Sequence, residues 1–327
     1  MPRAFVTGAG DFVGLNLIEA LRDEGWDVLA FLSPKTDPVY LERLGVDMIQ
    51  GEISELSDLR SAMPDAVDAV FHAVYNVSLW SKDAQEQTRA NVQGTACAVR
   101  VALEKGVGRF IHTSNVLAYG LHNGTVTEDT PSKAASSTIN FVRSKGLAES
   151  EVRKGLRKGL DAVIINPANL IGPYDTQGWS RLFRLVDKGR MPFMAAGGGS
   201  FCHSRAMAKA HVAAYDNGRT GANYLLGGAN STYLNLLAEI AQLLHRRVLP
   251  RALPGRVLSA MAVADESRAN LLRGKPVITR ETVELLSSHT YCRSERAQKE
   301  LGYSAVSLKD MLEDCRQWLR QEGMIKR

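Results

Sequence analysis

Cysteines are scarce in this sequence, which excludes several classes of protein at the outset. Only four occur among the 327 residues, and Cys97, Cys202, Cys292 and Cys315 lie far apart with no pair at metal-ligand spacing. A disulfide-stabilised scaffold and a cysteine-based metal centre are therefore not expected. Because no apolar leader segment is recognisable near residue 1 either, we expect reduced thiols, a cytoplasmic protein and no metal.

Long hydrophobic runs, aromatic residues and an excess of one charge are also missing. No apolar run reaches the roughly 18 residues of a membrane span. Aromatic residues make up 7% of the chain, and the formal net charge is only +5. The lysines and arginines are scattered, whereas a nucleic-acid-binding surface gathers them into a stripe with interleaved aromatics. The expected partner is therefore a small molecule, with no membrane and no nucleic acid.

What the sequence does contain is a regular alternation of strand-like and helical segments. Its composition, 45% hydrophobic and 23% charged, suits a globular enzyme with a large core. The strand-like runs are 4–6, 27–32, 46–50, 69–73, 109–113 and 162–166, and the amphipathic segments between them include 16–24, 84–105 and 143–158. This alternation predicts an α/β fold of the Rossmann type, a doubly wound parallel sheet covered by helices on both faces.

Beyond about Gly172 the alternation becomes irregular. The run Gly197-Gly198-Gly199 predicts a flexible turn. A strand at 223–226 and helices near 234–244, 281–287, 295–301 and 308–322 complete this half. We therefore predict a dinucleotide-binding domain over 1–171, to which segments around 201–230 return. A smaller, mostly substrate-binding lobe is expected over 172–327.

A glycine-rich turn after the first strand is the most informative motif. Glycines in such a turn let the backbone approach a pyrophosphate, and the first amides of the following helix point at its negative charge. The residues expected to hold the phosphates are Gly8, Gly10, Asp11, Phe12, Val13 and Gly14.

The ends of the next strands carry the other expected cofactor contacts. No carboxylate stands at the end of the second strand, where Ser33 and Lys35 are found instead; a basic residue there binds a 2′-phosphate, which favours NADP(H) over NAD(H). Glu52 can accept from the adenine amino group while Ile53 packs on the ring. The cofactor ribose is expected beside the residues that end the fourth strand, Ala73, Val74 and Tyr75. His72, inside that strand, is expected to be a hydrogen-bonded core histidine.

Seven motifs follow one another in order along nearly the whole chain. They are Thr7-Gly8…Gly14, Glu52-Ile53, Phe71-His72-Ala73, Asn91-Val92-Gln93-Gly94-Thr95, Arg109-Phe110-Ile111-His112-Thr113-Ser114, Ser144-Lys145-Gly146-Leu147-Ala148-Glu149 and Asn166-Pro167…Gly172-Pro173. Together they resemble the extended short-chain dehydrogenases/reductases of the NAD-dependent epimerase/dehydratase superfamily. Within that family the chain resembles the dihydroflavonol-reductase-like and 3β-hydroxysteroid-dehydrogenase-like branch.

The resemblance implies hydride transfer assisted by a Ser or Thr, a Tyr and a Lys. A phenol can protonate a carbonyl oxygen if a nearby ammonium stabilises the phenolate. Lys145 is present, but Phe141 stands at the tyrosine position and Asn115 at the Ser/Thr position; Ser114, one residue earlier, is expected to point the other way. These four form the implied catalytic set.

The resemblance also implies further contacts. The segment holding Pro167 and Asn169 lines the nicotinamide in the family, and Asn91 orders the site. Family members dimerise through two long helices, here 84–105 and 143–158, so a homodimer is implied. Asp11 departs from the family, which has its middle glycine at this position; a carboxylate there repels the pyrophosphate unless it turns outward.

Phe141 leaves three interpretations open. In the first, the chain is an ordinary reductase recorded as a Tyr-to-Phe variant. In the second, Phe141 is natural and another acid serves, the candidates being Tyr75, Tyr119, Tyr174 and His203. In the third, the chain binds a dinucleotide without redox turnover, as a regulator, a scaffold, or a lyase-like or epimerase-like enzyme. Loss of a general acid lowers a rate by roughly a hundred- to ten-thousand-fold, so Phe141 weighs against an unassisted oxidoreductase.

Our hypothesis is an NAD(P)-dependent oxidoreductase for a carbonyl or secondary alcohol of a small, fairly apolar molecule. The apolar substrate is inferred from large side chains in segments expected to cover the site, namely Trp80, Trp179, Phe183, Met191, Phe193 and Met194. The alternative is a catalytically impaired or non-redox dinucleotide-binding protein.

Overall fold

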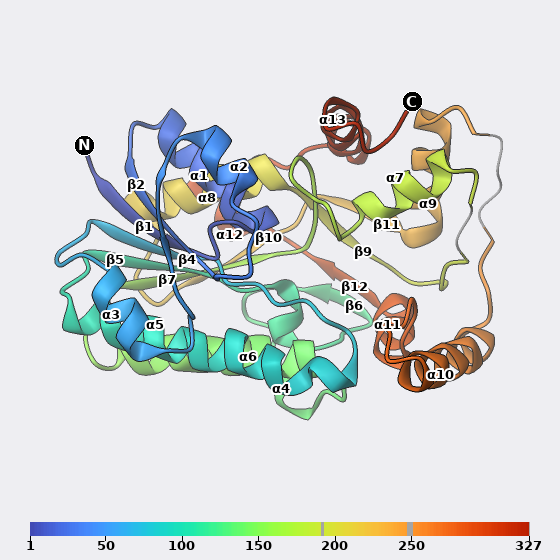
Figure 1. Ribbon diagram of the computed structural model, residues 1–327, viewed down its shortest axis with the longest axis horizontal. Helices are drawn as coiled ribbons and strands as arrows, with labels where there is room; N and C mark the ends of the chain where they lie inside the picture. The colour runs from blue at the N-terminus through green and yellow to red at the C-terminus, as the bar shows by residue number, and fades with distance from the viewer. Residues whose placement is uncertain (191–192, 247–250, 327) are drawn as a thin grey trace.

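The computed structural model describes residues 1–190, 193–246 and 251–326. Its centre is a seven-stranded sheet with the order β10-β7-β5-β4-β1-β2-β3, in which every neighbouring pair is parallel. The strands are β1 (Arg3–Thr7), β2 (Asp27–Leu32), β3 (Asp47–Gln50), β4 (Ala69–His72), β5 (Arg109–Thr113), β7 (Ala162–Pro167) and β10 (Asn223–Leu226). The predicted doubly wound parallel sheet is thus confirmed, and the strand order reverses between β1 and β4 (Figure 1).

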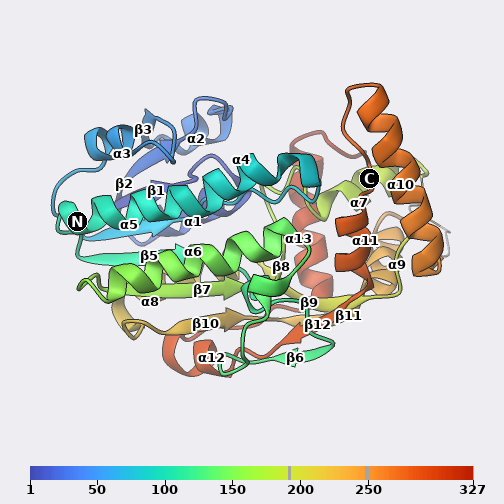
Figure 2. The same ribbon diagram turned by 90° about the horizontal axis from the view of Figure 1, so that it is seen from below.

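Helices cover both faces of this sheet (Figures 1 and 2). On one face α1 (Phe12–Asp23) packs against α8 (Ser204–Asn217), while on the other α5 (Gly94–Glu104) packs against α6 (Asn140–Leu156) and α3 (Leu56–Ala62). The shorter helices of this half are α2 (Val39–Leu44), α4 (Ala84–Thr88) and α12 (Glu295–Leu301). Because β10 and α8 come from beyond residue 200, the chain leaves the seven-stranded sheet and its covering helices and later returns to them.

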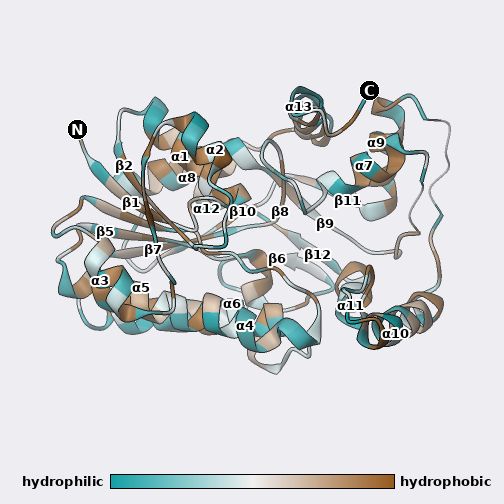
Figure 3. Ribbon diagram, in the orientation of Figure 1, coloured by the Kyte–Doolittle hydropathy of each residue, from teal (hydrophilic) through white to brown (hydrophobic). Residues whose placement is uncertain are grey.

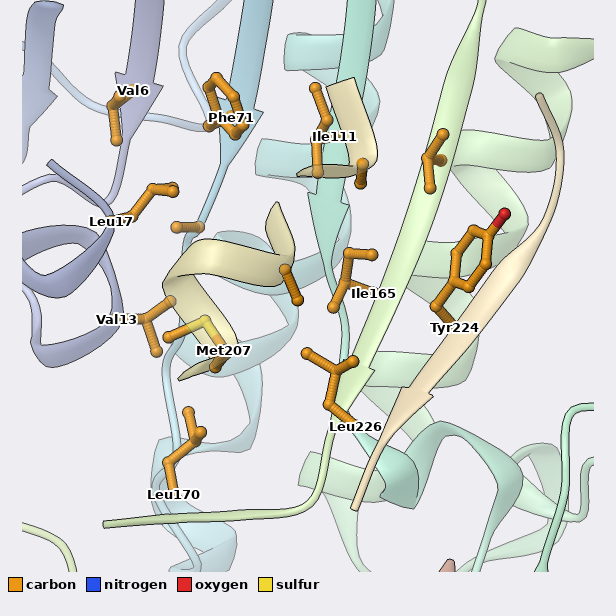
Figure 4. Close-up of a cluster of buried hydrophobic side chains, with 14 of the residues drawn as sticks. Val6, Val13, Leu17, Phe71, Ile111, Ile165, Leu170, Met207, Tyr224 and Leu226 are labelled. Carbon is orange, nitrogen blue, oxygen red and sulfur yellow. The ribbon is translucent and has the colours of Figure 1, made fainter. Parts of the chain in front are cut away.

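The main core lies between the sheet and the α1–α8 layer. Hydrophobic residues concentrate in the strands (Figure 3). Side chains from α1, such as Val13 and Leu17, meet Phe71 of β4 and Met207 of α8 in one buried cluster (Figure 4). Burial on both faces explains why these strands are almost continuously apolar.

The rest of the molecule, called the second lobe below, is built around a second, smaller sheet. Its strands are β11 (Ala229–Thr232), β9 (Gly198–His203), β12 (His289–Cys292) and β6 (Gly124–Val126), with β8 (Asn169–Ile171) paired to β9. The helices around it are α7 (Ser180–Asp187), α9 (Tyr233–Leu243), α10 (Gly255–Leu271), α11 (Arg280–Ser287) and α13 (Leu308–Gln321).

One local prediction is wrong, and a second one is refined. The glycine run does not form a flexible turn, because Gly198 and Gly199 are buried in β9; a Cβ on Gly198 would lie 2.8 Å from the carbonyl oxygen of Ser231 on the paired strand. The helix predicted over 84–105 is interrupted by a π-helical segment, Arg89–Gln93, between α4 and α5. Such segments are often found at functional sites.

Three histidines lie buried in the main sheet and on α8. As predicted, His72 is a bonded core residue, held by Thr7 at 2.8 Å and Thr95 at 2.9 Å. His112 stacks on His72 at 5.4 Å, and neither of its ring nitrogens has a hydrogen-bond partner in the described part of the chain. His211 bonds the hydroxyl of Thr113.

These histidines should make the fold sensitive to acid. Burial lowers the pKa of His72 to about 3, that of His211 to about 4, and that of His112 well below its usual value. Below about pH 6.5 the unfolded chain binds protons at these histidines and the folded chain does not. The free energy of unfolding should therefore decrease as the pH is lowered, by up to about 1.4 kcal/mol per histidine per pH unit. Urea unfolding across this range measures the slope. His112→Leu should raise stability and flatten the slope, and an unchanged slope would contradict the assignment.

Candidate active site

The turn between β1 and α1 is packed closely against the end of β4. Gly8 has φ +68°, and a Cβ on it would lie 2.6 Å from the carbonyl oxygen of Ala73; a Cβ on Gly14 would lie 2.2 Å from the carbonyl oxygen of Gly8. The glycines therefore bring the first turn of α1 to the strand ends, where its free amide groups face outward. A side chain at Gly8 or Gly14 would collide with the backbone packed against it, so this close turn, which suits a pyrophosphate, requires glycine at both positions.

A cavity of about 680 Å³ opens in front of this turn. It runs along the carboxyl ends of the parallel strands, where ligands bind in doubly wound sheets, and is closed by segment 275–290 of the second lobe. Of the predicted cofactor and catalytic residues, those lining it are Gly10, Asp11, Phe12, Val13, Tyr75, Asn115, Phe141 and Asn169. The contribution of 275–290 could not be predicted from local sequence patterns, because that segment reaches the cavity only through the tertiary fold.

Asp11 is the residue immediately before α1. Its φ of −89° is open to any residue, and its carboxylate makes no capping hydrogen bond to the helix. The residue is exposed to the open cleft. Protein atoms around its carboxyl group nevertheless displace water that would stabilise the charged form, which raises its pKa to about 6. An ionised carboxylate therefore stands where the diphosphate is expected.

Replacing Asp11 with asparagine should tighten dinucleotide binding. Two like charges about 4 Å apart repel by about 1 kcal/mol in water, so a five- to tenfold gain is expected near pH 8. The gain should shrink as the pH falls through about 6, because Asp11 is then protonated. Titration of Asp11→Asn and of the exposed Asp23→Asn at both pH values measures it, and equal affinities of the two variants would refute the repulsion.

The residues expected at the adenosine end do not line this cavity. Lys35 is exposed, with its ammonium 3.7 Å from Glu86. Ser33 accepts a hydrogen bond from the backbone amide of Lys35 at 3.3 Å, and Ile53 packs against Gly94. Glu52 precedes Ile53 after β3. These four residues follow the ends of β2 and β3, which are neighbours at one side of the main sheet.

Lys145 lies on α6 behind the cavity wall. It is only 1% exposed, and its Nζ atom lies 3.4 Å from the carbonyl oxygen of Thr113, 3.5 Å from that of Val74 and 4.4 Å above the centre of the Tyr75 ring. Burial lowers its pKa to about 7, and Glu149 one turn later opposes this shift. The site thus holds an ammonium that titrates near neutrality.

Phe141, Asn115 and Tyr75 form the wall in front of this ammonium. The ring of Phe141 is buried and meets the Tyr75 ring edge-on, with 5.7 Å between centroids. The side-chain amide of Asn115 donates to the Tyr75 hydroxyl at 2.8 Å. Residues far apart in the sequence therefore place a phenol, an amide and an ammonium together.

Ser114 lies on the other side of β5. Its hydroxyl donates to Glu149 at 2.6 Å, and the same carboxylate accepts from Asn166 at 2.6 Å. Alternation along the chain turns Ser114 away from the cavity, as expected, so it supports α6 and does not face a substrate. Of the remaining cofactor positions, Ala73, Val74 and Pro167 lie behind the lining, and Asn169 donates to the carbonyl of Ser200.

Asn91 connects the interrupted helix to the site. Its amide donates to the carbonyl of Asn76 and to the hydroxyl of Ser144, each at 3.0 Å, and its oxygen accepts from the Asn76 amide. It thereby fixes the segment after β4 against the residue that precedes Lys145. Sequence reasoning identified Asn91, but not its partner Asn76.

The structure separates the four substitute acids. Tyr75 lines the cavity beside Asn115, whereas Tyr119 lines a different, smaller cavity. Tyr174 reaches the cavity, but its hydroxyl donates to Glu19 at 2.7 Å. His203 bonds Asp314 at 3.0 Å and does not line the cavity.

The six large side chains proposed to cover the substrate are also divided. Trp80 and Trp179 line the cavity. Phe183 and Met194 are buried in the core of the second lobe, Phe193 is 53% exposed, and Met191 lies outside the described residues. Apolar walls are supplied instead by other residues, among them Val77, Leu79, Leu117, Val277, Leu285 and Leu286.

The glycine turn at a switch point of a parallel sheet, with a buried lysine beside the cleft, defines a dinucleotide-dependent enzyme. A family model confirms this class: the chain belongs to the NAD dependent epimerase/dehydratase family, whose model matches residues 4–227. The predicted family is therefore confirmed, and at the level of that family the chain is an NAD(P)-dependent oxidoreductase.

Individual relatives cover nearly the whole chain. Sterol demethylase protein B of Methylococcus capsulatus is 30% identical and covers 98% of this chain and 99% of its own. The 2-alkyl-3-oxoalkanoate reductase of Stenotrophomonas maltophilia is 28% identical over 92% of this chain and 94% of its own. The crystal structure of gox2253 superposes with a TM-score of 0.86 at 29% identity, over 100% of both chains.

No helix within 1–190, 193–246 or 251–326 is long and apolar enough to cross a bilayer. In the same ranges no group of three or more His, Cys, Asp or Glu residues is arranged to hold a metal ion.

Proposed function

We propose that this chain reduces a carbonyl, or oxidises a secondary alcohol, of a small and fairly apolar molecule, with NADP(H) preferred over NAD(H). The observation that carries the proposal is the buried Lys145 ammonium beside a cavity that also presents the Asn115 amide. When bound, the dinucleotide supplies or accepts the hydride. Lys145 holds the nicotinamide ribose and stabilises negative charge, and Asn115 orients the substrate oxygen.

The remaining cofactor residues are proposed in the roles expected from the sequence. The turn from Gly8 to Gly14 holds the diphosphate, Glu52 and Ile53 the adenine, Ala73 and Val74 the ribose, and Pro167 and Asn169 the nicotinamide. The seven-stranded sheet and its covering helices, including β10 and α8, thus serve as the cofactor domain, and the second lobe serves as the substrate cover. The apolar substrate is supported by Trp80, Trp179 and the leucine and valine walls.

The preference for NADP(H) depends on Ser33 and Lys35. Lys35→Glu should weaken NADPH binding by roughly tenfold, because it replaces a charge-assisted contact by repulsion, and should leave NADH binding nearly unchanged. Fluorescence titration with both coenzymes measures this, with Lys154→Glu, on the exposed side of α6, as the control. Equal losses for both coenzymes would refute the preference.

The experiment that tests the function combines binding and turnover. Purified protein is titrated with NADPH and then assayed on a panel of apolar ketones, aldehydes and secondary alcohols, in parallel with Phe141→Tyr. Turnover by the chain itself supports the proposal. If NADPH binds but neither protein turns over any compound, a second function is favoured.

That second function is dinucleotide binding without redox turnover, and Phe141 is the observation that favours it. A benzene ring at the family's tyrosine position has no proton to give.

In either case we propose a cytoplasmic homodimer that pairs through α4–α5 and α6, where Leu147 is 47% exposed. Light scattering of Leu147→Glu, which should be monomeric, tests this pairing.

A further inference from the structure

The side-chain orientation of Asn115 is fixed by its surroundings. Its oxygen accepts from the backbone amide of Leu117 at 2.9 Å, so its NH₂ group must face Tyr75. The hydroxyl oxygen of Tyr75 is thereby the acceptor, and in the described part of the chain its hydrogen has no acceptor. A phenol hydrogen is therefore free beside an amide that keeps a second hydrogen for a substrate oxygen.

The position of this phenol suits proton donation. Tyr75 and Asn115 both line the cavity, and the Tyr75 ring contacts both the Phe141 ring and the Lys145 ammonium. Burial raises the pKa of the Tyr75 phenol, and a cation beside the ring opposes this effect because it favours the phenolate. The phenol thus lies beside the ring that occupies the family's tyrosine position.

Other phenols in the region lack this combination. The Tyr174 hydrogen is engaged by Glu19, and Tyr119 lies in another cavity. Tyr40 and Tyr233 also line the cavity, but the Tyr40 ring packs against Tyr174 and Trp318, and the Tyr233 ring stacks on Trp179.

We infer that Tyr75 is the proton donor of the reduction, in place of the missing tyrosine at position 141; this inference rests on the proposed function. The hydride of a reduced nicotinamide dinucleotide forms a C–H bond at the carbonyl carbon as the π pair moves to oxygen. That oxygen takes the proton of Tyr75, which gives an alcohol and the oxidised dinucleotide. The phenolate, stabilised by Lys145, regains a proton from water in the cleft.

The first test compares Tyr75→Phe, Phe141→Tyr and the double variant. Tyr75→Phe should lower kcat/KM by roughly a hundred- to ten-thousand-fold, the usual loss for a general acid, while NADPH binding stays unchanged. Tyr119→Phe removes a phenol from the other cavity and should behave as the parent. The double variant should regain activity, because Phe141→Tyr restores a donor.

The second test does not depend on turnover. The positive charge of oxidised nicotinamide should move the titration of one phenol to lower pH, visible in ultraviolet difference spectra of the dinucleotide complex and absent from Tyr75→Phe. If Tyr75→Phe proves unstable, 3-fluorotyrosine at position 75 replaces it, and because fluorination makes the phenol more acidic, the phenol titration seen in the difference spectra should move to still lower pH.

The outcomes separate the two proposals. Full activity of Tyr75→Phe, or activity that appears only with Phe141→Tyr, overturns the inference and leaves the reductase function in place. Absence of dinucleotide binding overturns the proposed function itself. If NADPH binds but nothing turns over, the titration decides: a phenol shift that persists in Tyr75→Phe overturns the assignment of Tyr75.

Discussion

Replacing Lys145 with methionine should reduce turnover by about a thousandfold, within the range for loss of an acid–base group. The ammonium lies 4.4 Å above the Tyr75 ring and is the buried cation closest to the proposed proton path. Because burial lowers its pKa to about 7, activity that needs the charged form should fall as the pH rises through neutrality. This pH dependence should disappear in Lys145→Met.

The same replacement should not weaken the fold. An ammonium whose pKa is lowered by burial costs stability; the full cost is present below the lowered pKa and disappears only above the ordinary lysine pKa, because the unfolded chain carries the charge without penalty. Lys145→Met should therefore unfold at the same or a higher temperature than the parent, which distinguishes lost chemistry from lost structure. Lys154→Met, on the exposed side of the same helix, is the control. Turnover that survives in Lys145→Met would remove this lysine from the site.

Replacing Gly8 with alanine should unfold the turn that holds the diphosphate. The added Cβ would sit 2.6 Å from a backbone oxygen of β4, and φ is +68°. A left-handed conformation alone costs a non-glycine residue roughly 1–2 kcal/mol. The clash should raise the loss to about 3 kcal/mol or more and abolish dinucleotide binding.

Gly25 provides a matched control for that experiment. Its φ is +77°, but a Cβ there meets no atom within 4 Å. Gly25→Ala should therefore lose only the conformational contribution and keep dinucleotide binding. Urea unfolding and coenzyme titration of both variants measure the difference, and equal losses would show that the contact with Ala73 does not matter.

Much of the fold could be predicted because its signals are local. The apolar runs, the glycine turn and the amphipathic segments lie within short windows, and they predicted the parallel sheet and the family. The second sheet was largely missed, since its strands are short and pair with partners distant in the chain. Gly198 and Gly199 show the difficulty: a glycine run typical of a turn is buried in β9 by its neighbours Ser231 and Tyr291.

The candidate site divides in the same way. Lys145, Asn115 and Asn91 could be identified as site residues from their motifs, and Ser114 was expected to face away. The partners of these residues were not predictable, because Asn76, Thr113 and the 275–290 segment join the site through contacts across the sheet and between lobes. Of four possible substitute acids, the sequence ranked none first.

The sequence by itself determined a dinucleotide-binding fold with phenylalanine at a position where its family has a proton donor. Glycine spacing and hydrophobic periodicity act over a few residues, so no distant information was needed. Only the tertiary structure decided that Tyr75 is hydrogen-bonded to Asn115, packs against Phe141 and lies beside the Lys145 ammonium. The reason is geometric. The carboxyl ends of the central strands β4 and β5 lie next to α6, and packing sets which side chains face the cavity there.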